Sequence, residues 1–227
     1  MKIKHVFFDL DHTLWDFEKN SGLTFRQIFK EENILLSFEA FISIYKPINL
    51  RYWKLYREEK VSKEELRYLR LKETFDALEY AISDILIDKI AINYIAFLPN
   101  HNHLFEGTFE LLTYLKDKYH LHIITNGFEE VQALKMEKSG LMPYFNKIVT
   151  SESVGVKKPN PKVFEFALQI SEAEIDNSIM IGDNLEADIQ GALDFGIKAI
   201  HCNFDQLLVA NKEIISVKSL AEIKLYL

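Results

Sequence analysis

The chain has 227 residues, of which 48% are hydrophobic and 27% charged, a composition typical of folded globular proteins rather than disordered ones. Its formal net charge of -7 predicts repulsion from nucleic-acid backbones and anionic lipids. Cys202 is the only cysteine, which excludes an intrachain disulfide and favours a reducing cytoplasm. No stretch approaches the roughly 20 apolar residues that a membrane span requires, so we expect a cytoplasmic protein.

A stretch near the amino terminus carries the first candidate chemistry. An apolar run over residues 3–8 is followed by two carboxylates, Asp9 and Asp11. This pattern predicts a buried strand whose carboxyl end opens into a cleft, where open α/β sheets place their chemistry. Environments push the pKa values of neighbouring carboxylates apart, so we interpret Asp9 as a nucleophile toward phosphorus and Asp11 as its acid/base partner. The alternative is that both acids, with Thr13, only cap a turn.

Residues 16–98 have the pattern of an all-helical block. Of the eight glycines only Gly22 lies before position 107, and helical hairpins need few glycines at their turns. Ser62 with Glu65 predicts a capping box at the start of one helix. Apolar side chains recur at helical spacing on both sides of Pro47 and again before Pro99. We expect these stripes to form the core of the block rather than a ligand site.

From Gly107 onward, helical patterns alternate with short apolar strands. The expected strands are 120–125, 147–151, 178–182 and 198–201, and the tail from 214 adds a short strand and a helix. This rhythm predicts an α/β fold, a Rossmann-like doubly wound parallel sheet. We expect residues 1–15 and 99–227 to form the catalytic core and residues 16–98 to form a helical cap that acts as a lid.

The turn after the expected strand at 120–125 carries groups suited to phosphate. Thr125 ends the strand, and Asn126 and Gly127 follow it. The Thr125 hydroxyl, Asn126 and the backbone N–H groups of this turn are candidates for holding phosphate oxygens. A hydroxyl at the end of a strand is also a common structural feature, so this motif alone does not decide between the two.

A lysine next to a proline is the candidate cation. Lys158 precedes Pro159, which restricts the turn. A lysine held there would offset the charge of Asp9 and stabilise a transition state with negative equatorial oxygens. We choose Lys158 over Lys157 for this reason. The alternative interpretation is a solvated basic loop.

The strand ending in Gly182-Asp183, with Asp188 one helical turn further on, predicts a magnesium site. Mg²⁺ prefers hard oxygen ligands and takes one or two carboxylates, with water and substrate completing its octahedron. Asp183 and Asp9 would ligate through carboxylate oxygens, and Asp11 through its backbone carbonyl. Asp188 would orient these ligands or bind through water.

Together these motifs resemble the haloacid dehalogenase superfamily, specifically its phosphohydrolase branch. They are Asp9-x-Asp11-x-Thr13, Thr125, Lys158 in Lys-Pro-x-Pro-x-x-Phe, and Gly182-Asp183-x4-Asp188. The resemblance covers essentially the whole chain. It implies a sheet ordered 5-4-1-2-3, with the Asp9 and Asp183 strands adjacent at the topological switch point, and a helical C1-type cap inserted after the first strand.

Within the superfamily, residues 48–53 and 58–62 and the segment Thr125-Asn126-Gly127-Phe128 resemble cytosolic house-cleaning 5'-nucleotidases that act on pyrimidine and non-canonical nucleoside monophosphates. His12 stands where Asp or Gly is common, a departure that bears on subfamily and substrate. The expected partner is therefore a small phosphorylated metabolite, a nucleoside monophosphate. Neither a nucleic-acid polymer nor a membrane is expected, and a monomer is favoured.

The resulting hypothesis is an Mg²⁺-dependent phosphomonoesterase that acts through an aspartyl-phosphate, with Asp9, Asp11 and Lys158 as its catalytic residues. Sugar-phosphate phosphatases and phosphomutases of the same core remain alternatives. A haloacid dehalogenase shares the nucleophile but has no leaving alcohol to protonate, so Asp11 argues against it. A non-enzymatic phospho-acceptor module would need about half this length and no lid.

Overall fold

The computed structural model describes residues 2–209 and 211–227. The chain forms two compact units. The first joins Met1–Phe17 to Asn102–Leu227, and the second is Glu18–His101. The sequence pattern placed these boundaries after residues 15 and 98.

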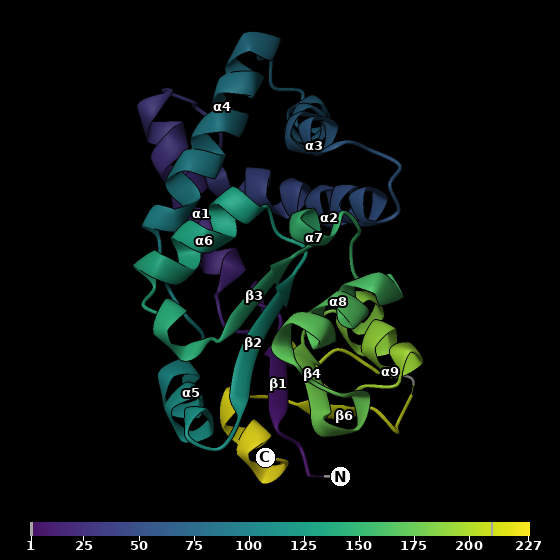
Figure 1. Ribbon diagram of the computed structural model, residues 1–227. Coiled ribbons are helices and arrows are strands. Elements are labelled where there is room, and N and C mark those ends of the chain that lie inside the picture. Colours follow the sequence, from purple (N-terminus) through teal and green to yellow (C-terminus); the bar gives the residue numbers. More distant parts are fainter. Residues whose placement is uncertain (1, 210) are drawn as a thin grey trace. The chain divides into compact units, whose positions relative to one another are not determined.

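The first unit is built on one parallel sheet, which is the α/β doubly wound architecture that the sequence predicts (Figure 1). Its strands are β1 (His5–Phe8), β2 (His120–Thr125), β3 (Lys147–Thr150), β4 (Ser178–Gly182), β5 (Lys198–Cys202) and β6 (Ile215–Val217). Their order is β3-β2-β1-β4-β5-β6. The expected order 5-4-1-2-3 is therefore confirmed, and β6 from the carboxyl-terminal tail extends the sheet beyond β5.

The central strand β1 brings the predicted site residues to one edge of the sheet. Phe8 pairs with Ile123 of β2 on one side and with Ile181 of β4 on the other. The Asp9 backbone N–H then donates to the Ile181 carbonyl at 2.8 Å. Because all three strands are parallel, the residues that follow them emerge together at their carboxyl ends.

Helices cover both faces of the sheet, with α5 on one side and α8 and α9 on the other (Figure 1). The helices of this unit are α5 (Thr108–Lys116), α6 (Glu129–Lys138), α7 (Ser151–Val154), α8 (Pro161–Ser171) and α9 (Gly191–Phe195). Helix α8 begins where the Asn160 side chain accepts from the Lys162 N–H, with Pro161 in its first turn. Its Phe164 joins the buried core with Phe7 of β1 and Met180 of β4.

The second unit is helical in its regular elements: α1 (Phe17–Glu31), α2 (Phe38–Arg57), α3 (Lys63–Ala77) and α4 (Asp84–Phe97), followed by a 3₁₀ turn, Leu98–Asn100. The predicted capping box of Ser62 and Glu65 is present at the start of α3. Helix α2 continues through Pro47 without a break. Pro47 is exposed, and a proline costs the helix one backbone hydrogen bond, which the buried side chains on both sides of it offset.

Two histidines, His5 and His122, are buried toward the amino-terminal end of the sheet. His5 Nδ1 lies 3.2 Å from His122 Nε2, and His122 Nδ1 lies 3.3 Å from the Ser171 hydroxyl. The His120 ring lies 5.1 Å from the His5 ring. Burial, together with the nearby positive potential of His5, His120 and Lys147, lowers the pKa of His122 to about 3. His122 is therefore neutral in the folded protein at neutral pH.

We expect acid to destabilise the protein through His122. The unfolded chain titrates near pH 6.5 and the folded one near 3, so the unfolded state binds more protons between these values. The stabilisation is complete above about pH 6.5 and is lost as the pH falls toward 3, by about 1 to 2 kcal/mol at pH 5. Urea unfolding of the wild type and of His122→Gln at pH 7 and pH 5 measures this decrease in the free energy of unfolding. Equal pH dependence in the two proteins would contradict it.

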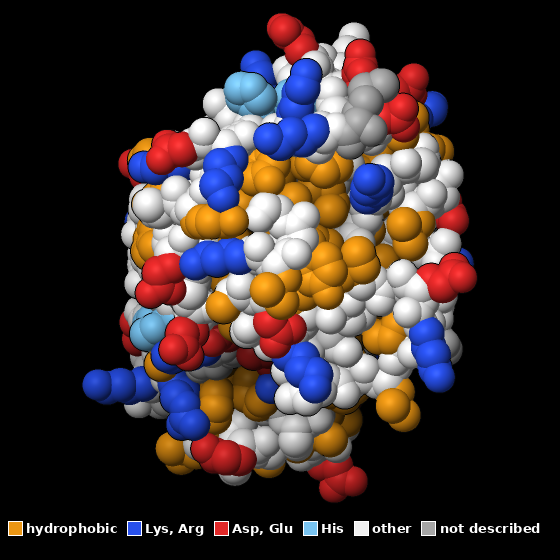
Figure 2. Space-filling view, turned by 90° about the horizontal axis from the view of Figure 1, so that it is seen from below, with side chains coloured by type: hydrophobic (Ala, Val, Ile, Leu, Met, Phe, Trp, Pro, Cys, Tyr) orange, Lys and Arg blue, Asp and Glu red, His pale blue; other side chains and the backbone are white. Residues whose placement is uncertain are grey.

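On the face shown in Figure 2, hydrophobic side chains gather near the middle, and acidic and basic side chains are interspersed around them. Within the ranges 2–209 and 211–227, no helix combines the length and apolar character that crossing a bilayer demands.

Candidate active site

A buried lysine joins two of the predicted acids. Lys158 Nζ donates to Asp9 Oδ1 at 2.7 Å and to the Ile124 carbonyl at 2.6 Å, and it lies 2.7 Å from Asp188 Oδ1. Only 1% of its side chain is exposed. Burial disfavours the ammonium, but Asp188 and Asp9 more than offset this and raise the pKa of Lys158 to about 12. The structure thus places Lys158 at the site, whereas Lys157 is half-buried beside it.

Three carboxylates crowd together around this lysine. One oxygen from each of Asp9, Asp183 and Asp188 lies within 4.8 Å of the other two. Burial raises the pKa of Asp9 well above its usual range, although Lys158 opposes the shift. Burial and the neighbouring Asp188 raise the pKa of Asp183 to about 8. One ammonium therefore does not balance the negative charge that these three groups would carry.

Asp188 reaches the site from a turn of π-helix, which is wider than an α-helix, that follows β4. The sequence pattern predicts a helix from Ile189, but residues Leu185–Gln190 form a turn of π-helix that leads into α9. Asp188 Oδ2 accepts from the Asn184 N–H at 3.0 Å, so the carboxylate turns back toward the end of the strand. Turns of π-helix are frequent at functional sites. Periodicity could not reveal this one, because it depends on a side chain bonding to the backbone.

The predicted acid/base residue has two partners that sequence reasoning missed. Asp11 Oδ1 accepts from Lys135 Nζ at 2.6 Å, and Asp11 Oδ2 accepts from Gln132 Nε2 at 2.9 Å. Both partners lie on α6. Burial lowers the pKa of Lys135, and the Asp11 carboxylate opposes that shift. The sequence carries a signal for these partners. Gln132 and Lys135 are three residues apart in the helix that follows the Thr125 turn, so both side chains lie on one face of that helix.

The Thr125 turn lies at the same edge. Thr125 Oγ1 accepts from the Gly127 N–H at 3.1 Å and from Gln132 Nε2 at 2.7 Å. Asn126 was predicted to hold phosphate, but its side chain is engaged with the backbone of Lys158. It donates to the Lys158 carbonyl at 3.0 Å and accepts from the Lys158 N–H at 2.8 Å. The Asn126 amide therefore fixes the loop that carries the lysine.

A known protein family matches most of the chain. The haloacid dehalogenase-like hydrolases match residues 6–202 of the chain. The chain belongs to this family. The match contains Asp9, Asp11, Thr125, Lys158, Asp183 and Asp188.

Relatives from several bacteria share most of the chain's length. It is 34% identical to the pyrimidine 5'-nucleotidase PynA of Streptococcus pneumoniae, with 89% of this chain and 85% of that protein covered. It is 30% identical to the pyrimidine 5'-nucleotidase YjjG of Escherichia coli, with 89% and 87% covered. A crystal structure of the HAD-hydrolase YfnB from Bacillus subtilis, bound to magnesium, has a TM-score of 0.90 at 28% identity and covers 100% of this chain and 99% of its own.

The residues at the site fit a magnesium ion. The cluster of Asp9, Asp183 and Asp188 offers hard oxygen ligands, the type that Mg²⁺ prefers. Burial and the neighbouring carboxylates raise the pKa values of Asp9 and Asp183, and a divalent cation bound there would favour their charged forms. Gly182 leaves room for this arrangement, because a Cβ atom there would lie 2.4 Å from Asp188 Oδ2.

We expect Gly182→Ala to weaken this site. The added methyl group would displace Asp188, and loss of such a supporting carboxylate costs about 10- to 100-fold in metal affinity. Calorimetric titration of the protein with MgCl₂ measures the effect. Gly22→Ala is the matched control, because its Cβ would make ordinary contact with Phe38 at 3.5 Å. Unchanged magnesium affinity in Gly182→Ala would show that Asp188 does not serve the metal.

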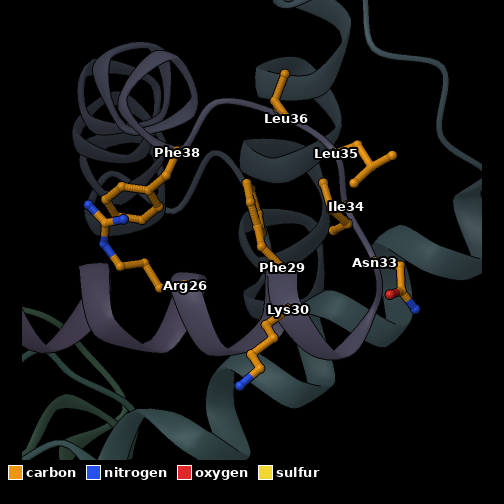
Figure 3. A pocket seen from close by; sticks show the side chains of 8 residues that line it. All are labelled: Arg26, Phe29, Lys30, Asn33, Ile34, Leu35, Leu36 and Phe38. Carbon is orange, nitrogen blue, oxygen red and sulfur yellow. The ribbon is translucent and has the colours of Figure 1, made fainter.

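A separate pocket of about 350 Å³ lies within the helical unit (Figure 3). Its lining residues come from α1, the segment between α1 and α2, and the first residue of α2: Arg26, Phe29, Lys30, Asn33, Ile34, Leu35, Leu36 and Phe38. The Arg26 guanidinium stacks 3.6 Å from the centre of the Phe38 ring. The lining contains none of the predicted site residues and no carboxylate, so this pocket is not the candidate metal site.

Proposed function

We propose that the chain is an Mg²⁺-dependent phosphomonoesterase that acts through an aspartyl-phosphate on nucleoside 5'-monophosphates with pyrimidine or non-canonical bases. The observation that carries the proposal is the environment of Asp9. This carboxylate follows the central strand, bonds to the buried Lys158 and shares a cluster with Asp183 and Asp188. Such an arrangement suits a nucleophile that must accept a group rich in negative charge.

In the first half-reaction, a carboxylate oxygen of Asp9 attacks phosphorus in line with the ester oxygen. The bond between phosphorus and that oxygen breaks, and Asp11, which enters this step in its protonated form, gives its proton to the departing alcohol. The products of this step are the free nucleoside and an aspartyl-phosphate at position 9. Lys158 offsets the charge on the transferring group.

In the second half-reaction, Asp11 acts as a base. It takes a proton from water, whose oxygen attacks phosphorus and breaks the bond to Asp9. Inorganic phosphate leaves, and both aspartates return to their initial states. Thr125 donates its hydroxyl hydrogen to a phosphate oxygen in both steps.

Asp9, Asp183 and the Asp11 backbone carbonyl would hold Mg²⁺, and Asp188 would orient them. When bound, the ion supplies positive charge that screens the phosphoryl oxygens from these carboxylates. The cluster of three carboxylates around the Lys158 ammonium supports this requirement. The crystal structure of YfnB with magnesium supports it as well.

The substrate class is supported by two relatives, since PynA and YjjG are both pyrimidine 5'-nucleotidases at or above 30% identity. The helical unit is proposed to select the leaving group. Its two connections run beside the Asp11 loop, where the Asp16 N–H donates to the His103 carbonyl at 3.0 Å and the Phe105 N–H donates to the Leu14 carbonyl at 3.0 Å.

A phosphate-release assay tests the proposal. The substrates are uridine, cytidine and thymidine 5'-monophosphates, a sugar phosphate and 4-nitrophenyl phosphate, each with Mg²⁺ and with EDTA. We expect release only with Mg²⁺ and a kcat/KM at least about tenfold higher for the nucleotides than for the sugar phosphate. No release from any ester, or equal rates in EDTA, would contradict the proposal. Chloride release from 2-chloropropionate would indicate a dehalogenase instead.

A further inference from the structure

Two buried polar side chains of α6 hold the Asp11 carboxylate, one on each oxygen. Lys135 donates to Oδ1 at 2.6 Å and Gln132 donates to Oδ2 at 2.9 Å. We infer that Gln132 and Lys135 are positioning residues that fix Asp11 for proton transfer, and that Gln132 also sets the direction of the Thr125 hydroxyl. The inference rests on the proposed function, since it assigns a purpose to contacts around its acid/base residue.

Lys135 is held against the site by its surroundings. Only 3% of its side chain is exposed, and its ammonium lies 4.2 Å from the Trp15 ring and 5.4 Å from the Phe17 ring. Among the described residues, its ammonium has one hydrogen-bond acceptor, Asp11 Oδ1. A buried ion pair contributes little net stability compared with an apolar replacement. The pair is therefore better explained by the orientation it gives Asp11 than by the stability of the fold.

Gln132 is fixed in one orientation by its acceptors. When Asp11 is ionised and paired with Lys135, its carboxylate only accepts hydrogen bonds, so the amide nitrogen of Gln132 rather than its oxygen faces Asp11. The same nitrogen donates to Thr125 Oγ1 at 2.7 Å, which uses both of its hydrogens. Gln132 Oε1 is buried without a partner in the described part of the chain. An unsatisfied buried oxygen costs free energy, which indicates that the two donated bonds decide the orientation.

The backbone leaves space for this amide. A Cβ atom at Gly127 would lie 2.3 Å from Gln132 Nε2 and 2.5 Å from its Cδ, too close for both to remain. Gly127 therefore permits Gln132 to reach Thr125 and Asp11 at once. Replacing Gly127 with alanine displaces the amide without changing either the carboxylate or Gln132 itself.

The Thr125 hydroxyl can act only as a donor toward a phosphate. Its oxygen accepts from the Gly127 N–H at 3.1 Å and from Gln132, so both lone pairs are used. Its hydrogen is then free to be donated to a phosphate oxygen. One amide thus orients the proton-transfer residue and the phosphate donor together.

A double-mutant cycle on kcat tests the inference, with 4-nitrophenyl phosphate and uridine 5'-monophosphate as substrates. We expect Lys135→Met to lower kcat about 10- to 100-fold and to change KM less than about threefold. In the Asp11→Asn background, the same substitution should lower kcat by less than about twofold, because its effect acts through Asp11. Lys135→Arg, which keeps the donor, should recover part of the loss.

Matched variants separate positioning from folding. Lys138→Met removes an exposed lysine from the same helix and should keep the wild-type kcat. Gln132→Leu and Gly127→Ala provide the second test if Lys135→Met fails to fold, and each should lower kcat about 10- to 100-fold while circular dichroism stays unchanged. A Lys135→Met loss of equal size in both backgrounds, or wild-type kcat in Lys135→Met or Gln132→Leu, would overturn the inference and leave the proposed function intact. Absence of phosphate release by the wild type would overturn both.

Discussion

Replacing Asp9 with asparagine should lower the rate of phosphate release by at least about 10⁴-fold. Asparagine has nearly the same shape, but its neutral amide oxygen is a poor nucleophile toward phosphorus. The substitution also removes one of the three carboxylates that would hold the metal. Steady-state phosphate release with uridine 5'-monophosphate and Mg²⁺ measures the loss.

The Asp9→Asn protein should remain folded. Burial disfavours the charged form of Asp9, and Lys158 keeps its contact with Asp188 at 2.7 Å when the Asp9 charge is removed. Thermal unfolding should therefore shift by only a few degrees. Asp117→Asn, an exposed carboxyl of the same unit, is the control and should keep wild-type activity. Near-normal release by Asp9→Asn would show that another group attacks phosphorus.

Replacing Lys158 with methionine should affect stability as well as activity. The substitution leaves the buried Asp9 and Asp188 and the half-buried Asp183 close together without the Lys158 ammonium. Removing one partner from a buried ion pair costs about 3 to 5 kcal/mol, because the remaining charge is uncompensated. We expect this decrease in the free energy of unfolding in urea at pH 7 with EDTA present. Phosphate release should fall by at least about 10²-fold.

Magnesium should offset part of the Lys158→Met defect. A cation that binds only the folded state raises the free energy of unfolding, and it would here replace some of the missing positive charge. The increase on adding Mg²⁺ should be larger in Lys158→Met than in the wild type. Lys157→Met, one residue away and half-buried, should show neither the loss of stability in EDTA nor the larger increase on adding Mg²⁺. Equal stability of Lys158→Met and the wild type in EDTA would contradict the assigned charge balance.

The bounds of the strands could be predicted closely because characteristic residue types stand at their ends. Strands β2 (His120–Thr125) and β4 (Ser178–Gly182) have the predicted bounds. In each, an apolar run stops at a hydroxyl or a glycine that begins a turn. Strand β1 begins at His5, two residues later than the apolar pattern indicated. The carboxyl-end residues could be predicted for the same reason, since parallel strands present their ends at one edge.

The contribution of α6 could not be predicted from periodicity. The apolar Leu134 is 42% exposed, whereas the polar Gln132 and Lys135 are buried. Hydrophobic patterns treat polar residues as outward-facing. This rule fails where the partner that makes burial tolerable comes from a distant segment, here Asp11. The π-helical turn that carries Asp188 was missed for a related reason, since it depends on a bond to Asn184.

The most direct test is to look for the covalent intermediate during turnover. The wild type is mixed with uridine 5'-monophosphate and Mg²⁺, quenched in acid within milliseconds and reduced with borohydride, which converts an aspartyl-phosphate into homoserine. Peptide mass spectrometry then locates the change. We predict homoserine at position 9 in the wild type and none when EDTA replaces Mg²⁺. Steady phosphate release with position 9 unmodified, or with the change at another residue, would contradict the assignment of Asp9 as the nucleophile.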